Sequence, residues 1–217
     1  DGLGYVPDQI VPGATTMIVL QNPGDNEEQS GIPAVGPSGE YLNNHFLPLA
    51  GLSRDNVSVG NVIKCRWRNP KKGEKTNDLP SAVGVWNKEN GKWDKKMGMA
   101  VEKVAMERCM SANWVTPLGT KLLVTLGGLA AKAIAKVDSV TEWRGHLAEE
   151  THDGAQVFLS LHPSYLLQTP RMSIPAMIDW KRIGMVLKGQ FPKPIPSRWI
   201  IGGEFTGKQI PAAPPET

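Results

Sequence analysis

The chain has 217 residues, two cysteines and a net charge of +3, which is too small to indicate a nucleic-acid partner by itself. That length suits about one domain with its own core, and so few cysteines cannot form a disulfide framework, which favours a reducing compartment. Because the sequence shows neither a signal peptide nor an apolar run near the roughly 18 residues of a membrane span, we expect a cytoplasmic monomer without a membrane partner.

Short apolar runs alternate with amphipathic stretches along the chain. In chain order, the patterns predict a strand at 17–20, a helix at 40–49, a strand at 57–63, a helix at 100–114, a strand at 122–126, a helix at 129–137, a strand at 157–161 and a helix at 176–187. Strands that alternate with helices favour a parallel sheet with helices on both faces. The expected fold is therefore α/β: a three-layer α/β/α domain around a four-stranded, mostly parallel central sheet.

Composition divides the chain into a domain at 1–191 and a proline-rich tail or linker at 192–217. A basic, tryptophan-rich insertion interrupts the domain at 66–98, where nine Lys or Arg residues stand against four Asp or Glu residues. Its tryptophans are Trp67, Trp86 and Trp93. The insertion is either a solvated excursion that its tryptophans pin to the body, or a flap that tracks phosphates and offers aromatic rings to bases.

Polar residues follow the predicted strands. Open α/β sheets bind ligands at the carboxyl ends of their strands, and here those ends carry Asn22, Asn61 and His162, together with a Gly-Gly pair. Taken singly, each has an ordinary structural explanation: a turn former, a buried amide with partners, a helix cap. The acidic run at 25–28 is more often a solvated loop than a metal site. The combination at four strand ends is what predicts one site.

Five motifs, in this order, resemble the uracil-DNA glycosylase superfamily. They are Asn-Pro-Gly at 22–24, Gly-Ile-Pro-Ala-Val-Gly-Pro-Ser-Gly at 31–39, Ala-Gly-Leu-Ser-Arg-Asp-Asn-Val at 50–57, Asn-Val-Ile-Lys-Cys-Arg at 61–66 and His-Pro-Ser-Tyr-Leu-Leu at 162–167. The resemblance covers residues 5–190 and is closest to the iron–sulfur branch, families 4 and 5, in a divergent form such as a phage would encode. It identifies 1–191 as a glycosylase-like domain.

The resemblance implies a DNA glycosylase, which flips a uracil or modified pyrimidine out of DNA and hydrolyses its N-glycosidic bond. His162 matches the residue that stabilises charge developing on the base carbonyl. Asn61 matches the reader of the Watson–Crick edge, and Asn22 matches a catalytic position where an amide orients water without removing its proton. The other expected base-binding residues are Gln21, Gly24 and Ala34. The residues expected to contact DNA are Ser164, Lys64, Arg66, Trp67, Arg68, Gly127 and Gly128.

Departures from the family pattern concern the pocket and the DNA. Ala34 stands where the family has a phenylalanine that stacks on the flipped base, which predicts either weak uracil activity or room for a bulkier base. Trp67 and Arg68 replace two prolines after Arg66, and Gln168 replaces an arginine.

The two cysteines raise the question of an iron–sulfur cluster. Cys65 and Cys109 match the third and fourth ligands of the family's 4Fe–4S cluster, while the first pair would fall upstream of Asp1. A thiolate-held cluster normally needs four cysteines, so this chain provides an incomplete ligand set. Either the two sulfurs lie together near the start of the chain, suited to such a pair, or both thiols are buried small hydrophobes.

Two other functions are open at this point. One is a catalytically impaired DNA-binding or replication-associated module on the same fold, with a replication polymerase or a fused domain as its partner. The proline-rich tail and the start at Asp1 rather than Met fit a domain within a longer polypeptide, for example one that works in a host cytoplasm. The other is a Rossmann-like nucleotide-binding enzyme, which the lack of a G-x-G-x-x-G or P-loop motif disfavours.

Overall fold

The structure is a computed structural model, and it describes residues 4–67 and 79–190. Arg68 and the proline-rich tail at 192–217 lie outside the described residues, as does part of the basic insertion. The division into a domain at 1–191 and a tail therefore stays a prediction.

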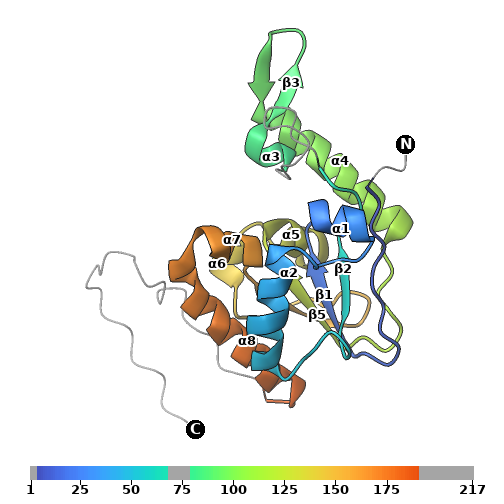
Figure 1. Cartoon of the computed structure of the whole chain (residues 1–217), viewed down its shortest axis with the longest axis vertical. Coiled ribbons are helices and arrows are strands. Elements are labelled where there is room, and N and C mark those ends of the chain that lie inside the picture. The colour runs from blue at the N-terminus through green and yellow to red at the C-terminus, as the bar shows by residue number, and fades with distance from the viewer. Residues whose placement is uncertain (1–3, 68–78, 191–217) are drawn as a thin grey trace, which may run out of the picture.

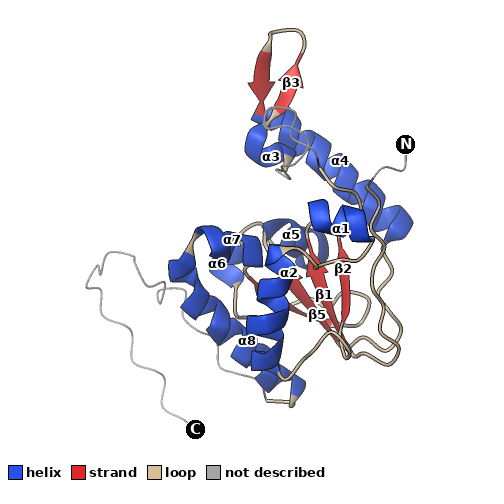
Figure 2. Cartoon of the chain, viewed as in Figure 1, coloured by secondary structure: helices blue, strands red, loops and turns tan. Residues whose placement is uncertain are grey.

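A four-stranded parallel sheet forms the centre of the molecule (Figure 1, Figure 2). Its strands are β1 (Thr16–Leu20), β2 (Ser58–Asn61), β5 (Leu122–Leu126) and β6 (Gln156–Ser160), in the order β2-β1-β5-β6. Every neighbouring pair is parallel, which confirms the predicted sheet. All residues of these strands except Gln156 are buried. Strands covered on both faces contain mostly apolar residues, as β1, β5 and β6 do, while β2 has the small or polar residues Ser58, Gly60 and Asn61.

Helices cover both faces of the sheet, which confirms the three-layer fold. On one face, α2 (Pro37–Tyr41) runs on through a π-helical turn and a 3-10 turn and packs with α8 (Ser173–Leu187). On the other face lie α4 (Lys95–Asn113) and α5 (Gly128–Ala135). Because successive strand residues point to opposite faces, β1 supplies apolar side chains to both cores.

The parallel strands end at one edge of the sheet, so the residues that follow them lie close together. β2 ends at Asn61, two residues earlier than predicted, although the N–H groups of Val62 and Ile63 still donate to the carbonyls of Leu20 and Gln21 at 3.0 and 2.9 Å. In the register Leu20 lies beside Asn61, and Leu126 lies beside Ser160. The residues that follow β1 and β6 therefore lie at the same edge of the sheet as Asn61.

A buried ion pair fixes the end of β6 to α8. The two carboxylate oxygens of Asp179 accept hydrogen bonds from the Arg144 guanidinium at 3.0 and 2.6 Å, and one of them also accepts from the Ser160 hydroxyl at 3.0 Å. Asp179 is fully buried, so its loss would leave a buried cation without its counter-charge. Ser160 is the last residue of β6, so the network also holds the strand end that carries His162.

Several short elements were not predicted from the sequence. They are α1 (Asp25–Ser30), α3 (Pro80–Val83), α6 (Val140–Trp143), α7 (Pro163–Gln168), a 3-10 turn at Pro170–Met172, and a hairpin of β3 (Val85–Asn87) and β4 (Lys92–Asp94). Each is too short for a hydrophobic period to show in the sequence. Neither these nor the longer helices of the described residues have the length and apolarity that crossing a membrane requires.

The hairpin, α3 and the N-terminal half of α4 form an arm, residues 79–104, that rises from the body near α1 (Figure 1). The C-terminal half of α4 anchors it to the core over β5 and α5. Met106 is buried in that core, and Ala105, Cys109 and Met110 pack against it. The position of the arm is thus set by the helix that it shares with the body.

Candidate active site

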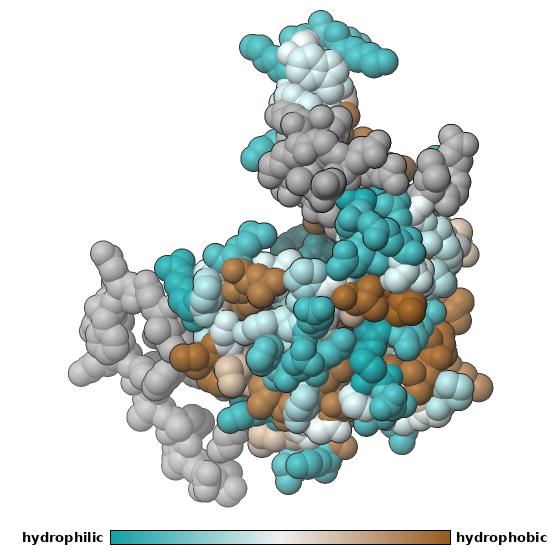
Figure 3. Space-filling model, viewed as in Figure 1, coloured by the Kyte–Doolittle hydropathy of each residue, from teal (hydrophilic) through white to brown (hydrophobic). Residues whose placement is uncertain are grey.

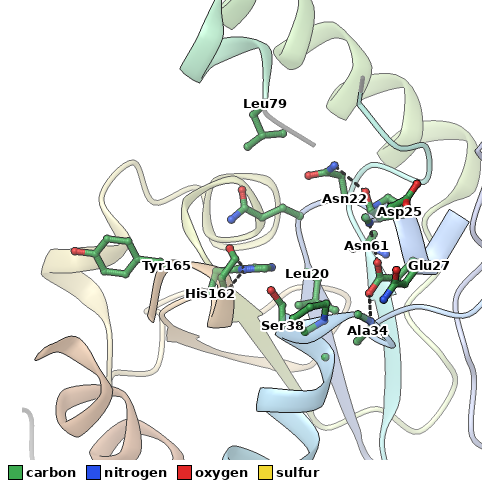
Figure 4. A pocket seen from close by; sticks show the side chains of 18 of the residues that line it. Leu20, Asn22, Asp25, Glu27, Ala34, Ser38, Asn61, Leu79, His162 and Tyr165 are labelled. Carbon is green, nitrogen blue, oxygen red and sulfur yellow. Dashed lines mark hydrogen bonds between the residues drawn. The ribbon is translucent and has the colours of Figure 1, made fainter. Parts of the chain in front are cut away.

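The residues after the strands surround a pocket of about 560 Å³ at the carboxyl edge of the sheet (Figure 4). As predicted, Asn22, Asn61 and His162 all line it. Figure 4 shows His162 on one side of this pocket and the two asparagines on the other. Four further residues predicted for the site also line it: Gln21, Gly24, Ala34 and Ser164. The convergence is therefore confirmed, while the chemical roles of these residues stay predictions.

Asn61 presents an unpaired amide to the pocket. The residue is 2% exposed, and its side chain makes no hydrogen bond to any of the described residues, although its backbone N–H lies 3.3 Å from Asp8 Oδ1. Among the described residues, Asn61 is not one of those with a polar side-chain atom that is both fully buried and unpaired, so its amide is open to the pocket, where a water or a ligand can pair with it. Its oxygen can accept and its NH₂ can donate, which suits the edge of a base.

His162 is held in one tautomer by the first turn of α7. Its Nδ1 accepts a hydrogen bond from the Ser164 backbone N–H at 3.1 Å and lies 2.7 Å from the Ser164 hydroxyl. A backbone N–H can only donate, so Nδ1 carries no proton and a neutral ring is protonated at Nε2. Burial lowers the pKa of His162 to about 4, so the ring is neutral at neutral pH. It can offer the pocket an uncharged N–H donor.

The depressed pKa makes the stability of the fold depend on pH. The unfolded chain binds a proton at an ordinary histidine pKa of about 6.5, whereas folded His162 does so at about 4. At this site the unfolded state binds more protons between these values, so the contribution of His162 to the unfolding free energy should fall by up to about 3 kcal/mol as the pH drops through that window. Burial raises the pKa of Asp179 to about 7, which changes the unfolding free energy in the opposite direction over the same window. The contribution of His162 is complete above the unfolded pKa, and urea unfolding across the window measures it.

His162→Gln is the reference for this measurement, since it keeps a polar side chain without the titrating ring. Between about pH 4 and 6.5, the slope of the unfolding free energy against pH should be less positive in H162Q than in the natural chain. Equal slopes in the two proteins would show that His162 does not carry the effect.

Glu27 joins two loops that form the pocket, and the sequence analysis missed its role. Its Oε2 accepts from the Gly24 N–H at 3.0 Å, and its Oε1 accepts from the N–H groups of Val35 and Gly36 at 3.0 and 2.8 Å. These charge-assisted bonds fix the loop that carries Asn22 against the loop before α2. A glutamate three residues after a helix-capping glycine is a capping-box pattern, and that spacing is the signal that could have revealed it.

The other acids of the run at 25–28, Asp25 and Glu28, pair with Arg66. Arg66 Nη1 lies 2.6 Å from Asp25 Oδ1 and 2.8 Å from Glu28 Oε2, and the Arg66 side chain is 3% exposed. In the described part of the chain, no group of three or more His, Cys, Asp or Glu side chains could hold a metal ion. The prediction that Arg66 contacts DNA is corrected, because its guanidinium is buried against α1.

Lys64 is also inside the protein, which corrects its predicted contact with DNA. Its Nζ lies 2.5 and 2.6 Å from the carboxylate oxygens of Asp8 and 5.2 Å from the ring centre of Trp114. With a side chain that is 1% exposed, this ammonium cannot reach a phosphate outside. Trp67 is half-buried and packs against the core over β5 and α5, so its ring contributes to the packing of the domain.

Gly127 and Gly128 lie where α5 begins, behind the residues that line the pocket. Gly127 has φ +89°, and a Cβ there would lie 2.4 Å from Gln21 Nε2 and 3.0 Å from His162 Cβ. Only glycine adopts this backbone readily and leaves room for such an approach. Gly127 thus lets the end of β5 pack against two site residues, and the contacts of both glycines with DNA stay predictions.

Ala34 forms the part of the pocket wall where the family pattern has an aromatic ring. It is 5% exposed and has φ 57°, a left-handed conformation that is uncommon outside glycine. Gly39 packs against it so closely that a Cβ on Gly39 would lie 2.0 Å from the Ala34 carbonyl oxygen. The backbone of this wall is therefore fixed, and its side chain is a single methyl group.

The two cysteines interact but do not complete a cluster site. Burial, with smaller contributions from Cys109 and Glu28, raises the pKa of the Cys65 thiol. The chain near Tyr5 passes beside Cys65, since the two residues form an antiparallel bridge. Neither cysteine is fully buried, which corrects the alternative of two buried hydrophobes. Two thiols are half of the usual ligand set, so the described residues do not fit a complete 4Fe–4S cluster, and no step of a reaction is assigned to one.

Comparisons with known proteins point to the same family as the motifs. A family model described as the uracil DNA glycosylase superfamily matches residues 7–181. The chain is 28% identical over 188 residues to a type-4 uracil-DNA glycosylase of Sulfurisphaera tokodaii, across 82% of this chain and 72% of that protein. Proteins of the same name are 28% identical in Saccharolobus solfataricus, across 55% of this chain and 62% of that protein, and 26% identical in Archaeoglobus fulgidus, across 83% and 80%.

Proposed function

This chain belongs to the uracil DNA glycosylase superfamily, and on that premise we propose that it takes a uracil or modified pyrimidine, flipped out of DNA, into the pocket and hydrolyses its N-glycosidic bond. The similarity to three type-4 enzymes supports this activity. The observation that carries the proposal is the pairing of two groups in one pocket: the unpaired buried amide of Asn61 and the neutral ring of His162.

The reaction breaks the bond between C1′ of the sugar and the ring nitrogen of the base. The bonding electrons leave with the base, which becomes an anion, while the sugar becomes oxocarbenium-like. The oxygen of a water bonds to C1′, and the proton that this water loses balances the charge of the departing base. The site must therefore supply a donor to the base carbonyl and a position for the water.

His162 and Asn22 meet these two needs. The Nε2–H of His162 donates to the base carbonyl as negative charge grows there, and a donor of this kind acts most strongly in the transition state. Asn22 Nδ2 donates to the Pro23 carbonyl at 3.2 Å, which fixes the plane of its amide. An amide can hold a water but cannot remove its proton at neutral pH. Stabilisation of the leaving base, more than a strong general base, then drives the reaction.

An abasic-site assay tests the proposed activity. Labelled oligonucleotides with one uracil or one 5-substituted uracil are incubated with the full chain and treated with alkali, which cuts a strand where a base is missing. Cleavage at that position supports the proposal. Binding of the strands without cleavage of any of them would favour a catalytically impaired DNA-binding module on the same fold.

Replacing Ala34 by phenylalanine should change which base is preferred. The ring would fill space beside the base plane, where it can stack on uracil and obstruct a bulkier base. Because a base–aromatic stack is worth ~1–3 kcal/mol, the ratio of kcat/KM for uracil to kcat/KM for a 5-substituted uracil should rise about tenfold or more. Excision of both bases from the same oligonucleotide sequence measures this ratio.

Ala34→Gly is the matched control, because glycine suits the left-handed backbone and adds no bulk. The ratio should stay close to its natural value in A34G. If A34F also leaves the ratio unchanged, Ala34 does not border the base.

DNA is the proposed partner of the site. A replication polymerase or fused domain as a second partner, the monomeric state and a cytoplasmic location stay predictions. Cys65 and Cys109 would hold a 4Fe–4S cluster only together with two further thiols.

A further inference from the structure

The hairpin of the arm carries a pair of tryptophans, of which Trp86 is exposed and Trp93 is half-buried. Trp86 of β3 lies opposite Trp93 of β4, with ring centroids 5.8 Å apart and ring planes at 63°. Trp86 is 48% exposed. Neither ring belongs to the hydrophobic cores or packs against them among the described residues. The exposed ring of Trp86 therefore does not pin the insertion to the body, whereas Trp67 packs against the core, as one of the two explanations expects.

Four lysines flank this pair along the hairpin, and we refer to them as the arm lysines: Lys88, Lys92, Lys95 and Lys96. All four are exposed, and within the described part of the chain none has an ion-pair partner. One exposed acid, Glu89, lies among them in the hairpin turn. Figure 3 shows the tip of the arm as a hydrophilic surface.

The stability of the arm does not explain this charge. Lys95 and Lys96 lie in the first turn of α4, where the helix dipole disfavours cations and no acid is present. The nearby carboxylates have structural partners: Asp94 accepts from a backbone N–H in the first turn of α4 at 3.0 Å, and buried Glu102 accepts from the Ser81 N–H at 3.1 Å. The tip thus has a positive surface although two of its lysines destabilise the start of α4. A positive surface of this kind suits a ligand with negative charge.

Close backbone contacts hold the elements of the arm together, and the root of the arm reaches the pocket. A Cβ on Gly98 of α4 would lie 2.0 Å from the Pro80 carbonyl of α3, and a Cβ on Gly84 would lie 3.0 Å from the backbone of Asp94. α3, the hairpin and α4 therefore pack as one unit. At its root, Leu79 lines the pocket, and Figure 4 shows it above Asn22. A strand that delivers a base to the pocket has the arm beside it.

We propose that the arm binds a single-stranded segment of the nucleic acid whose base occupies the pocket, with Trp86 stacking on an unpaired base and the arm lysines contacting phosphates. This inference rests on the proposed function and adds the strand state of its substrate. Single strands expose the faces of their bases, whereas a duplex hides them in its stack, so an exposed indole among unpaired lysines fits a single strand best. A protein partner fits less well, because lysine is depleted in protein–protein interfaces.

Binding of uracil-free oligonucleotides tests this proposal separately from excision. Fluorescence anisotropy would give the Kd of the full chain for a labelled single strand and for its duplex. Trp86→Leu should weaken binding of the single strand about tenfold and affect the duplex much less, whereas Trp86→Phe keeps an aromatic face and should retain most of the affinity.

The charge component has its own readout in the salt dependence. Each phosphate contact on a single strand contributes roughly 0.7 to the slope of log Kd against log salt. The double variant K88Q/K92Q should therefore lower that slope by about 1.4. The matched control is K121Q/K181Q, which removes two exposed lysines outside the arm and should leave the slope unchanged.

Two results would overturn the proposal. One is a W86L variant that binds the single strand as tightly as the natural chain does, which would favour a protein as the partner of the arm. The other is an equal loss of single-strand and duplex affinity together with a lower Tm in W86L, since the tryptophan pair would then serve the fold alone. Selective loss of single-strand binding, in a chain that nonetheless excises no base, would support the arm and contradict the proposed function.

Discussion

Replacing His162 by alanine should lower kcat for base excision by about 10²–10³ and leave the Kd for uracil-containing DNA nearly unchanged. The Nε2–H of this ring meets little charge on the carbonyl of bound uracil and much more on the departing anion. Its tautomer is set by the Ser164 N–H at 3.1 Å, so the donor is oriented before the substrate arrives. Single-turnover excision and anisotropy binding on one oligonucleotide measure the two quantities.

His45→Ala is the control for this change, because His45 is exposed and does not line the pocket. It should excise at the natural rate. Natural excision by H162A, or a loss of DNA binding as large as its loss of rate, would remove His162 from its proposed role.

Replacing Asn61 by aspartate should lower kcat/KM for uracil by at least about 100-fold. The two side chains have the same shape, but the carboxylate has no NH₂ donor and places negative charge against the base edge. Asn61→Ala loses both hydrogen bonds without adding charge and should cost less than N61D. Steady-state excision of uracil by the three proteins measures the order of these effects.

Thermal unfolding separates this role from a structural one. The Asn61 side chain has no hydrogen-bond partner among the described residues, so N61A should keep the natural Tm or exceed it. A structural amide would lower the Tm on removal, because its former partners would be left unpaired in the interior. A clear fall in the Tm of N61A would therefore count against the account of the pocket.

The sheet and the convergence of the site could be predicted because both follow from local patterns. β1, β5 and β6 are mostly apolar, and β2 lies in a stretch that Val57, Val62 and Ile63 bound. Parallel strands bring their carboxyl ends to one edge, so Asn22, Asn61 and His162 had to meet once the strands were placed. The exact end of β2 could not be read, because Val62 and Ile63 are as apolar as the strand before them.

The partners of the charged residues could not be predicted, because they come from distant parts of the chain. Lys64 follows a strand and resembles a phosphate contact, but Asp8, 56 positions away, buries it. Arg66 likewise forms buried ion pairs with Asp25 and Glu28. The sequence alone does not show which basic side chains form buried ion pairs. The arm lysines are exposed, and none of them forms an ion pair with a described acid.

Mass spectrometry after incubation of the full chain with an oligonucleotide that contains one uracil tests the central claim most directly. We expect the natural chain to produce equal amounts of free uracil and of a strand that lacks this base, and H162A to produce both much more slowly. An unchanged strand that is bound by the protein, with no free uracil in solution, would contradict the account and leave a DNA-binding module on a glycosylase fold.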